Sequence, residues 1–97
     1  MRFDLTDLRL FREVVDAGSI TAGAEACALA LAAASTRIRN MEATLGAPLL
    51  TRSRQGVAPT PAGRMLLKHA RTLLDQAAMV QIYALLGWPY ERYGLLA

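Results

Sequence analysis

Residues 31–61 read LAAASTRIRNMEATLGAPLLTRSRQGVAPTP, and this stretch decides the fold. Apolar residues recur at helical spacing through its first half, until the Gly-Ala-Pro sequence at 46–48 stops the helix. Two short extended segments follow, joined by a tip that contains a glycine, and this pattern predicts a β-hairpin. Thr60-Pro61 then predicts a new helix, because a Thr hydroxyl can cap free N–H groups and proline is tolerated in the first turn.

The helix predicted over residues 31–45 has two unlike faces. Apolar residues share the first face: Ala34, Ile38, Met41 and Leu45. Small or polar residues share the second face: Ala32, Ser35, Thr36, Arg39 and Ala43. Small side chains let a helix come close to a partner, and hydroxyl groups can donate or accept hydrogen bonds. We therefore expect the first face in the core and the second against a partner.

The segment before this stretch begins with a predicted helix whose apolar residues recur at helical spacing from Leu5 to Val15. Asp4 or Thr6 can cap its start, because each has a side-chain oxygen that can accept from the free N–H groups. Gly18 then ends the helix.

A short second helix is predicted after Ser19 or Thr21, either of which can be its cap, and it reaches residue 26 or 27. Gly23 lies inside this helix, at a cost of about 1 kcal/mol relative to alanine. We interpret this glycine as a place where another backbone comes close. Residues 28–30 are predicted to form a tight turn before the next helix.

The helix that starts at Pro61 can run to about Leu86, a length of roughly 39 Å at 1.5 Å per residue. An apolar stripe follows it at a 4-3-4-3-4 spacing: Leu66, Ala70, Leu73, Ala77, Val80 and Ala84. Such a stripe favours packing against another helix. Packing against the chain's own domain accounts for it as far as Leu73, whereas beyond Asp75 a dimer partner is the better explanation.

These elements together predict a mainly α fold, a winged helix-turn-helix with three helices and a short β-hairpin wing. A long linker or dimerisation helix follows it. We expect residues 1–60 to form the winged helix-turn-helix, residues 61–86 the linker helix, and residues 87–97 an atypical apolar tail.

Positive charge is concentrated in the middle of the chain. Residues 31–72 contain seven basic residues and one acidic residue, whereas residues 1–30 contain three basic and five acidic residues. A compact domain with this distribution favours a polyanion as partner. A basic, solvated surface without a partner is the alternative.

Several classes of protein do not fit the sequence. Cys27 is the only cysteine, which excludes an internal disulfide and a thiolate metal cluster. His69 is the only histidine and has no carboxylate or nucleophile at a usable spacing, so we expect no enzyme, no metal site and no cofactor. The chain shows neither an apolar signal core nor the roughly 20 apolar residues of a membrane span, and we expect a soluble, cytoplasmic protein.

DNA is the polyanion that fits the residues best. The outward residues of the 31–45 helix can face bases in a major groove: Ala32, Ala33, Ser35 and Thr36. Arg37, Arg39 and Asn40 lie further along for phosphates or a guanine edge. The wing at 52–56 offers Arg52, Arg54 and Gln55 to a minor groove, and Arg64 is a further candidate for phosphate binding. Helix propensity alone is the alternative explanation for the alanine-rich run.

Residues 4–72 resemble the LysR-type transcriptional regulators. The motifs that carry the resemblance are Leu8–Phe11, Gly18-Ser19-Ile20-Thr21, Ala24-Glu25, Ser35, Ile38, Met41-Glu42, Leu45-Gly46, Leu49-Leu50-Thr51-Arg52, Val57, Thr60-Pro61-Ala62-Gly63 and His69-Ala70-Arg71. The resemblance implies that residues 31–45 are a recognition helix and that the linker helix forms a homodimer. It also implies binding to double-stranded DNA, at an interrupted inverted repeat near a promoter.

The recognition helix departs from the family pattern. The family usually opens this helix with Ser-Gln-Pro, where this chain has Ala30, Leu31 and Ala32, and Thr36 stands where an arginine is frequent. Ser35 is the usual base-facing position that matches. Because Leu31 cannot make the hydrogen bonds of a glutamine, we expect methyl contacts and DNA shape to contribute more to recognition than paired hydrogen bonds do.

Family members continue into a ligand-sensing domain, which this sequence does not contain, so we expect no small-molecule effector here. The tail at 79–97 includes Tyr83, Trp88, Tyr90 and Tyr93 and does not resemble the usual continuation. It is a truncated or frame-altered end, a patch that packs on the dimer partner, or a docking site for another protein. An alternative function follows from the apolar stripe: an interaction module that forms heterodimers with a full-length regulator.

Overall fold

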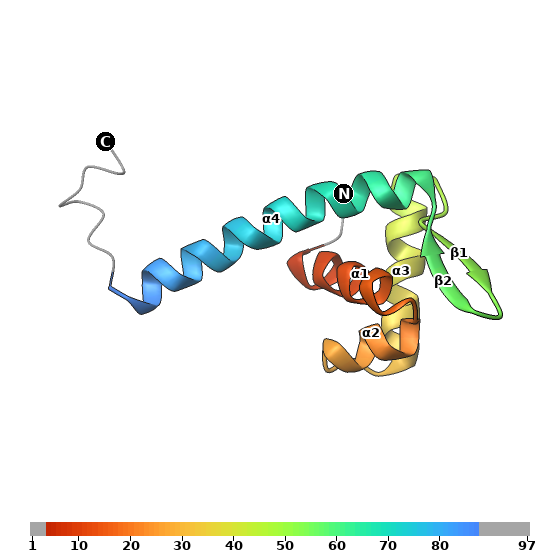
Figure 1. Cartoon of the computed structure of the whole chain (residues 1–97), viewed down its shortest axis with the longest axis horizontal. Helices are drawn as coiled ribbons and strands as arrows, with labels where there is room; N and C mark the ends of the chain where they lie inside the picture. The colour runs from red at the N-terminus through yellow and green to blue at the C-terminus, as the bar shows by residue number, and fades with distance from the viewer. Residues whose placement is uncertain (1–3, 88–97) are drawn as a thin grey trace.

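The computed structural model describes residues 4–87 of the 97-residue chain. Its elements, in chain order, are α1 (Leu5–Ala17), α2 (Ile20–Ala26), α3 (Leu31–Leu45), β1 (Leu50–Ser53), β2 (Gly56–Pro59) and α4 (Pro61–Leu85). Elements α1 to β2 gather into a head, from which α4 extends as a long rod (Figure 1). The predicted winged helix-turn-helix is confirmed, and α4 ends one residue before the expected Leu86.

Side-chain caps set the starts of three helices. Asp4, rather than Thr6, caps α1, and Asp4 and Asp7 each accept a hydrogen bond from the other's backbone N–H at 3.0 Å. Ser19, rather than Thr21, caps α2. Thr60 caps α4 by accepting from Gly63 N–H at 3.0 Å. At the start of α3, Ala30 supplies no side-chain cap, as its methyl group dictates.

The core lies where α1, α3, α4 and the start of the hairpin meet. Its largest fully buried side chains are Phe11, Leu10, Ile38, Met41, Leu49 and Val14. Ala34 is also fully buried, which confirms the predicted inner face of α3 for three of its four residues. Leu45 is the exception: it is 43% exposed, because it lies in the last turn of α3 at the rim of the core, beside Leu66 and Met65 of α4.

Gly23 packs α2 against α1, as the sequence predicted for a close approach. A Cβ atom at this position would overlap the backbone and side chain of Val14. A turn joins α2 to α3, but it lies at residues 27–28 rather than over 28–30, with Ala28 at a φ of 55°.

The hairpin is tied to the corner between α1 and α2. Its antiparallel register pairs Leu50 with Pro59 and Ser53 with Gly56. Val57 N–H donates to the Gly18 carbonyl at 3.0 Å. Gly56, at a φ of 123°, lies so close to this carbonyl that a Cβ atom would overlap it. The wing therefore has a fixed position beside the start of α2.

The first half of α4 belongs to the head, and the second half leaves it. Ala70 is fully buried and packs with Leu66 and Leu74 in the core. Of the two explanations for the start of the apolar stripe, packing within the chain's own domain therefore holds at Ala70, whose side chain is not available to a partner. Farther along, Leu73 is 52% and Val80 60% exposed. Residues 88–97 of the apolar tail, with Trp88, Tyr90 and Tyr93, lie outside the described residues.

Candidate nucleic-acid interface

The outer face of α3 is open and consists of small side chains. Ala32, Ala33, Thr36 and Asn40 are exposed, and Ser35 is half-buried. This arrangement follows from the inner positions Ala34, Ile38 and Met41, which turn the opposite side of the helix outward. The four exposed residues, but not Ser35, border a hollow of about 540 Å³, whose other side consists of Asp4 and Asp7 at the start of α1. The sequence placed the helix face correctly but did not predict this acidic neighbour.

Arg37 lies in this hollow and forms ion pairs within the chain. Its Nη1 atom is 2.8 Å from Asp7 Oδ1 and 3.6 Å from Asp4 Oδ1. The hydrogen bond to Asp7 raises the pKa of Arg37, while the Asp7 backbone N–H lowers the pKa of the Asp4 carboxyl. The sequence offered Arg37 as a DNA contact, whereas the structure directs this guanidinium to two carboxylates thirty or more residues away.

Arg39 is exposed and lies one turn after Thr36. Its Nη2 atom donates to Thr36 Oγ1 at 3.2 Å. This hydrogen bond orients the Thr36 hydroxyl, which then has its own proton left to donate. Unlike Arg37, Arg39 has no acidic partner among the residues that the structure describes. Its positive charge therefore lies next to the outer face of α3 without a carboxylate to neutralise it.

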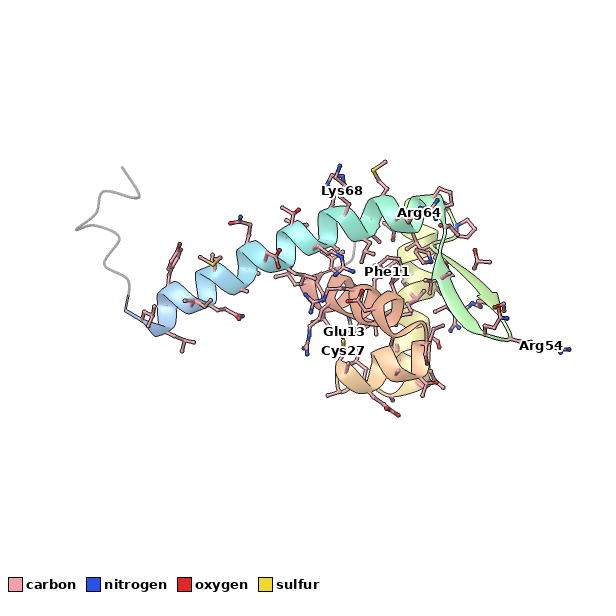
Figure 2. The ribbon with its side chains drawn as sticks, in the orientation of Figure 1. Phe11, Glu13, Cys27, Arg54, Arg64 and Lys68 are labelled. Atoms are coloured by element: carbon pink, nitrogen blue, oxygen red, sulfur yellow. The ribbon has the colours of Figure 1, made fainter. Side chains whose placement is uncertain are left out.

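The wing presents its polar residues to solvent. Arg52 and Gln55 are exposed, and Arg54 projects outward from the tip of the hairpin (Figure 2). Arg54 and Gln55 form the turn between β1 and β2, and the Gln55 N–H donates to Ser53 Oγ at 3.3 Å. The hydrogen bond between Val57 and Gly18 holds β2 against the head, so the backbone that carries these side chains has a defined position.

Further cations lie along α4. Arg64 is exposed near the base of the hairpin and donates to the Pro59 carbonyl at 3.3 Å, whereas Lys68 stands one turn farther from the wing (Figure 2). His69 is exposed and borders an apolar hollow of about 550 Å³ together with Leu45 and Met65. Arg64 is thus the residue of α4 that best extends the basic surface of the wing.

Metal sites, membrane-spanning helices and free cysteines are the other features that could give residues 4–87 a function. No group of three or more His, Cys, Asp or Glu side chains there is placed to hold a metal ion. No helix within that range is long and apolar enough to cross a membrane. Cys27 is half-buried, and burial raises the pKa of its thiol. The outer face of α3 and the wing are therefore the features around which a function can be built.

Comparison with known proteins agrees with this geometry. A family model described as "Bacterial regulatory helix-turn-helix protein, lysR family" matches residues 5–64. The nitrogen assimilation regulatory protein nac of Klebsiella aerogenes is 39% identical over 79 residues, which cover 81% of this chain and 26% of that protein. The small neutral protease regulatory protein of Streptomyces coelicolor strain A3(2) is 40% identical over 74 residues, covering 76% of this chain and 23% of that protein. The chain spans about a quarter of the length of these relatives.

Two solved complexes with DNA are also similar. The DNA-binding domain of BenM, in complex with the benA site 1 DNA, has a TM-score of 0.76 and 33% identity, covering 87% of this chain and 99% of that one. The DNA-binding domain of CbnR, in complex with DNA, has a TM-score of 0.78 and 28% identity, covering 90% of this chain and 100% of that one. The likeness thus extends over both the head and most of α4.

Proposed function

The chain belongs to the lysR family of bacterial regulatory helix-turn-helix proteins, and on this basis we propose that it binds specific sequences of double-stranded DNA to regulate transcription. Two observations carry the proposal: the outer face of α3 exposes small side chains, and the charged residues of the wing are all basic. DNA complexes of similar domains, BenM and CbnR, support it.

In this proposal α3 enters the major groove. The methyl groups of Ala32, Ala33 and Thr36 contact thymine methyls, and the Ser35 and Thr36 hydroxyls donate to or accept from base edges. The outer face has no long side chain in its first turn apart from Leu31, which is 50% exposed. Base preference therefore rests on close approach and DNA shape as well as on hydrogen bonds.

The affinity comes from phosphates. Arg52, Arg54 and Arg64 are exposed and, among the described residues, have no acidic partner, so their charge is available to the DNA backbone. Arg39 supplies a fourth contact beside α3. Gln55 accompanies Arg54 into the minor groove at the wing tip. Each phosphate contact releases counterions, so binding weakens as salt rises.

A homodimer completes the proposed assembly. Exposed residues of the apolar stripe, Leu73 and Val80, together with the half-buried Leu66 and Ala77, pack against the α4 helix of a second copy. Two-fold symmetry then presents two α3 helices to the two halves of an inverted repeat. A regulator of a bacterial chromosome works in the cytoplasm.

Selection from a pool of random duplexes tests the proposal. Protein-bound duplexes are enriched over several rounds and sequenced, with the Ser35→Ala protein treated in parallel. We expect an interrupted inverted repeat from the wild-type protein and a changed half-site from the variant. A pool without any common sequence after selection would contradict sequence-specific binding.

A further inference from the structure

Asp7 is the one charged residue that is buried among residues 4–87, with 5% of its surface exposed. A buried carboxylate is costly unless it is paired and hydrogen-bonded. Here its partner is Arg37, at 2.8 Å, and Asp4 lies 3.6 Å from the same nitrogen atom. The two carboxylates and the guanidinium therefore form one cluster that joins the start of α1 to the middle of α3.

The cluster lies next to the face that we propose meets DNA. Asp4, Asp7 and Arg37 line the same hollow as Ala32, Ala33, Thr36 and Asn40. Two carboxylates at this place would repel the phosphates of bound DNA. Charges that are separated by less than the Debye length, about 10 Å at moderate salt, still interact through the solvent. Within the described residues, Arg37 is the cation paired with both of them.

From this geometry we infer that Arg37 is a positioning and charge-neutralising residue rather than a DNA contact. It fixes α3 to the start of α1 and cancels the negative charge of Asp4 and Asp7 beside the outer face of α3. The inference rests on the proposed DNA binding. Its competitor is a direct role, in which the N–H groups of Arg37 that do not face Asp7 bind a phosphate.

A double-mutant cycle separates the two roles. Affinity for the selected duplex is measured for wild type, R37Q, D4N/D7N and the triple variant D4N/D7N/R37Q, each over a salt series. If Arg37 neutralises the carboxylates, R37Q weakens binding on the order of tenfold at low salt, and the loss shrinks as salt rises. The triple variant then binds within about twofold of D4N/D7N, because no carboxylate remains to be neutralised.

R54Q in the same two backgrounds is the matched control. Arg54 has no acidic partner among the described residues. R54Q should therefore lower the affinity for DNA by the same factor in the wild-type and the D4N/D7N backgrounds. A loss for R37Q that persists undiminished in the D4N/D7N background would overturn the inference and make Arg37 a phosphate contact. Wild-type protein that binds neither selected nor scrambled duplex would contradict the proposed function itself, which is a distinguishable result.

Folding is monitored by thermal melts of every variant. Asparagine remains a good cap, so D4N/D7N retains both oxygen acceptors at the start of α1. Should R37Q unfold, R37K preserves the charge and is expected to bind within about threefold of wild type. The comparison of D4N/D7N with the triple variant still decides the case, because neither contains the buried carboxylate that requires Arg37.

Discussion

Arg71 of α4 and Asp16 of α1 form an ion pair, with 2.6 Å between Arg71 Nη2 and Asp16 Oδ1, although 55 residues separate them in sequence. The hydrogen bond to Asp16 raises the pKa of Arg71. Arg71 lies between Ala70 and Leu74, two residues of α4 that pack in the core. The pair therefore contributes to the direction in which the long helix leaves the head, and in the proposed homodimer this direction sets the separation of the two heads.

Removing this ion pair should affect the preference for spacer length between the two half-sites more than it affects the stability of the protein. Both side chains are nearly half exposed, so R71A should lower the free energy of unfolding by about 1 kcal/mol or less. Affinities for inverted repeats whose spacers differ by single base pairs should become more nearly equal, because α4 is less firmly held. The conservative variant R71K is the control. An unchanged spacing preference in R71A would contradict this role.

Charge in the apolar stripe should abolish dimerisation. Val80 is 60% exposed and lies beyond the part of α4 that packs on the head, so V80E leaves the core intact. We expect monomers in sedimentation experiments and a large loss of affinity for the inverted repeat, since each half-site is then bound alone. K68E, on a different side of the same helix, is the control for an added carboxylate. A V80E protein that stays dimeric would place the interface elsewhere.

Gly23 should not tolerate a methyl group. An alanine in a helix ordinarily stabilises it by about 1 kcal/mol over glycine. Here the added Cβ would overlap Val14, so G23A should instead destabilise the protein by about 1–3 kcal/mol. Urea denaturation measures the change. A26G, at an exposed position at the end of α2, is a control with a normal propensity cost, and greater stability of G23A would refute the close packing of α1 and α2.

The Asp4 cap should make stability depend on acid pH. Its pKa is lowered in the folded state by the hydrogen bond from Asp7 N–H, whereas an unfolded aspartate titrates at about 3.9. The unfolded chain therefore binds more protons in acid. The contribution of Asp4 is present above pH 4 and is lost as pH falls through the lowered value. As pH is lowered from 6 to 2.5, the melting temperature should fall less steeply in D4N than in wild type. Parallel curves for the two proteins would argue against a stabilising contribution from ionised Asp4.

Wing and recognition helix should respond differently to mutation. R54A removes a phosphate contact, so it should weaken binding to every sequence and lower the slope of log Kd against log salt by about 0.9. S35A should change the preferred base and leave the salt slope as it is. Both are read from one set of anisotropy titrations. If S35A instead lowered the salt slope and R54A changed the preferred base, α3 would not face the bases.

Local signals made most of the fold predictable from the sequence. Asp4, Ser19 and Thr60 cap the starts of α1, α2 and α4, and Gly18 and Gly46 cap the ends of α1 and α3, so these bounds follow from residues close to them in the chain. The inner face of α3 followed from its periodicity. Leu45 was expected on the buried face but is exposed, because the burial of a residue at a helix end depends on how far the neighbouring helices extend.

Contacts between distant residues could not be predicted in the same way. Nothing local indicates that Arg37 pairs with Asp7, or Arg71 with Asp16, because long charged side chains find partners only after the helices have packed. The sequence predicts Arg37 as a DNA contact, and its ion pairs with Asp4 and Asp7 are visible only in the folded structure. The acidic excess in the first thirty residues, opposite the basic middle of the chain, was the signal that could have suggested such pairs.

Fluorescence anisotropy over a salt series tests directly whether this protein distinguishes one DNA sequence from another. The labelled DNAs are the intergenic duplex upstream of the coding sequence and a scrambled duplex of equal length and composition. If α3 recognises a specific sequence, the protein binds the native duplex more tightly at every salt concentration, and its affinity for both duplexes falls as salt rises. Equal, weak binding to both duplexes would contradict it, because α3 would then add nothing to the attraction between the basic surface and phosphate.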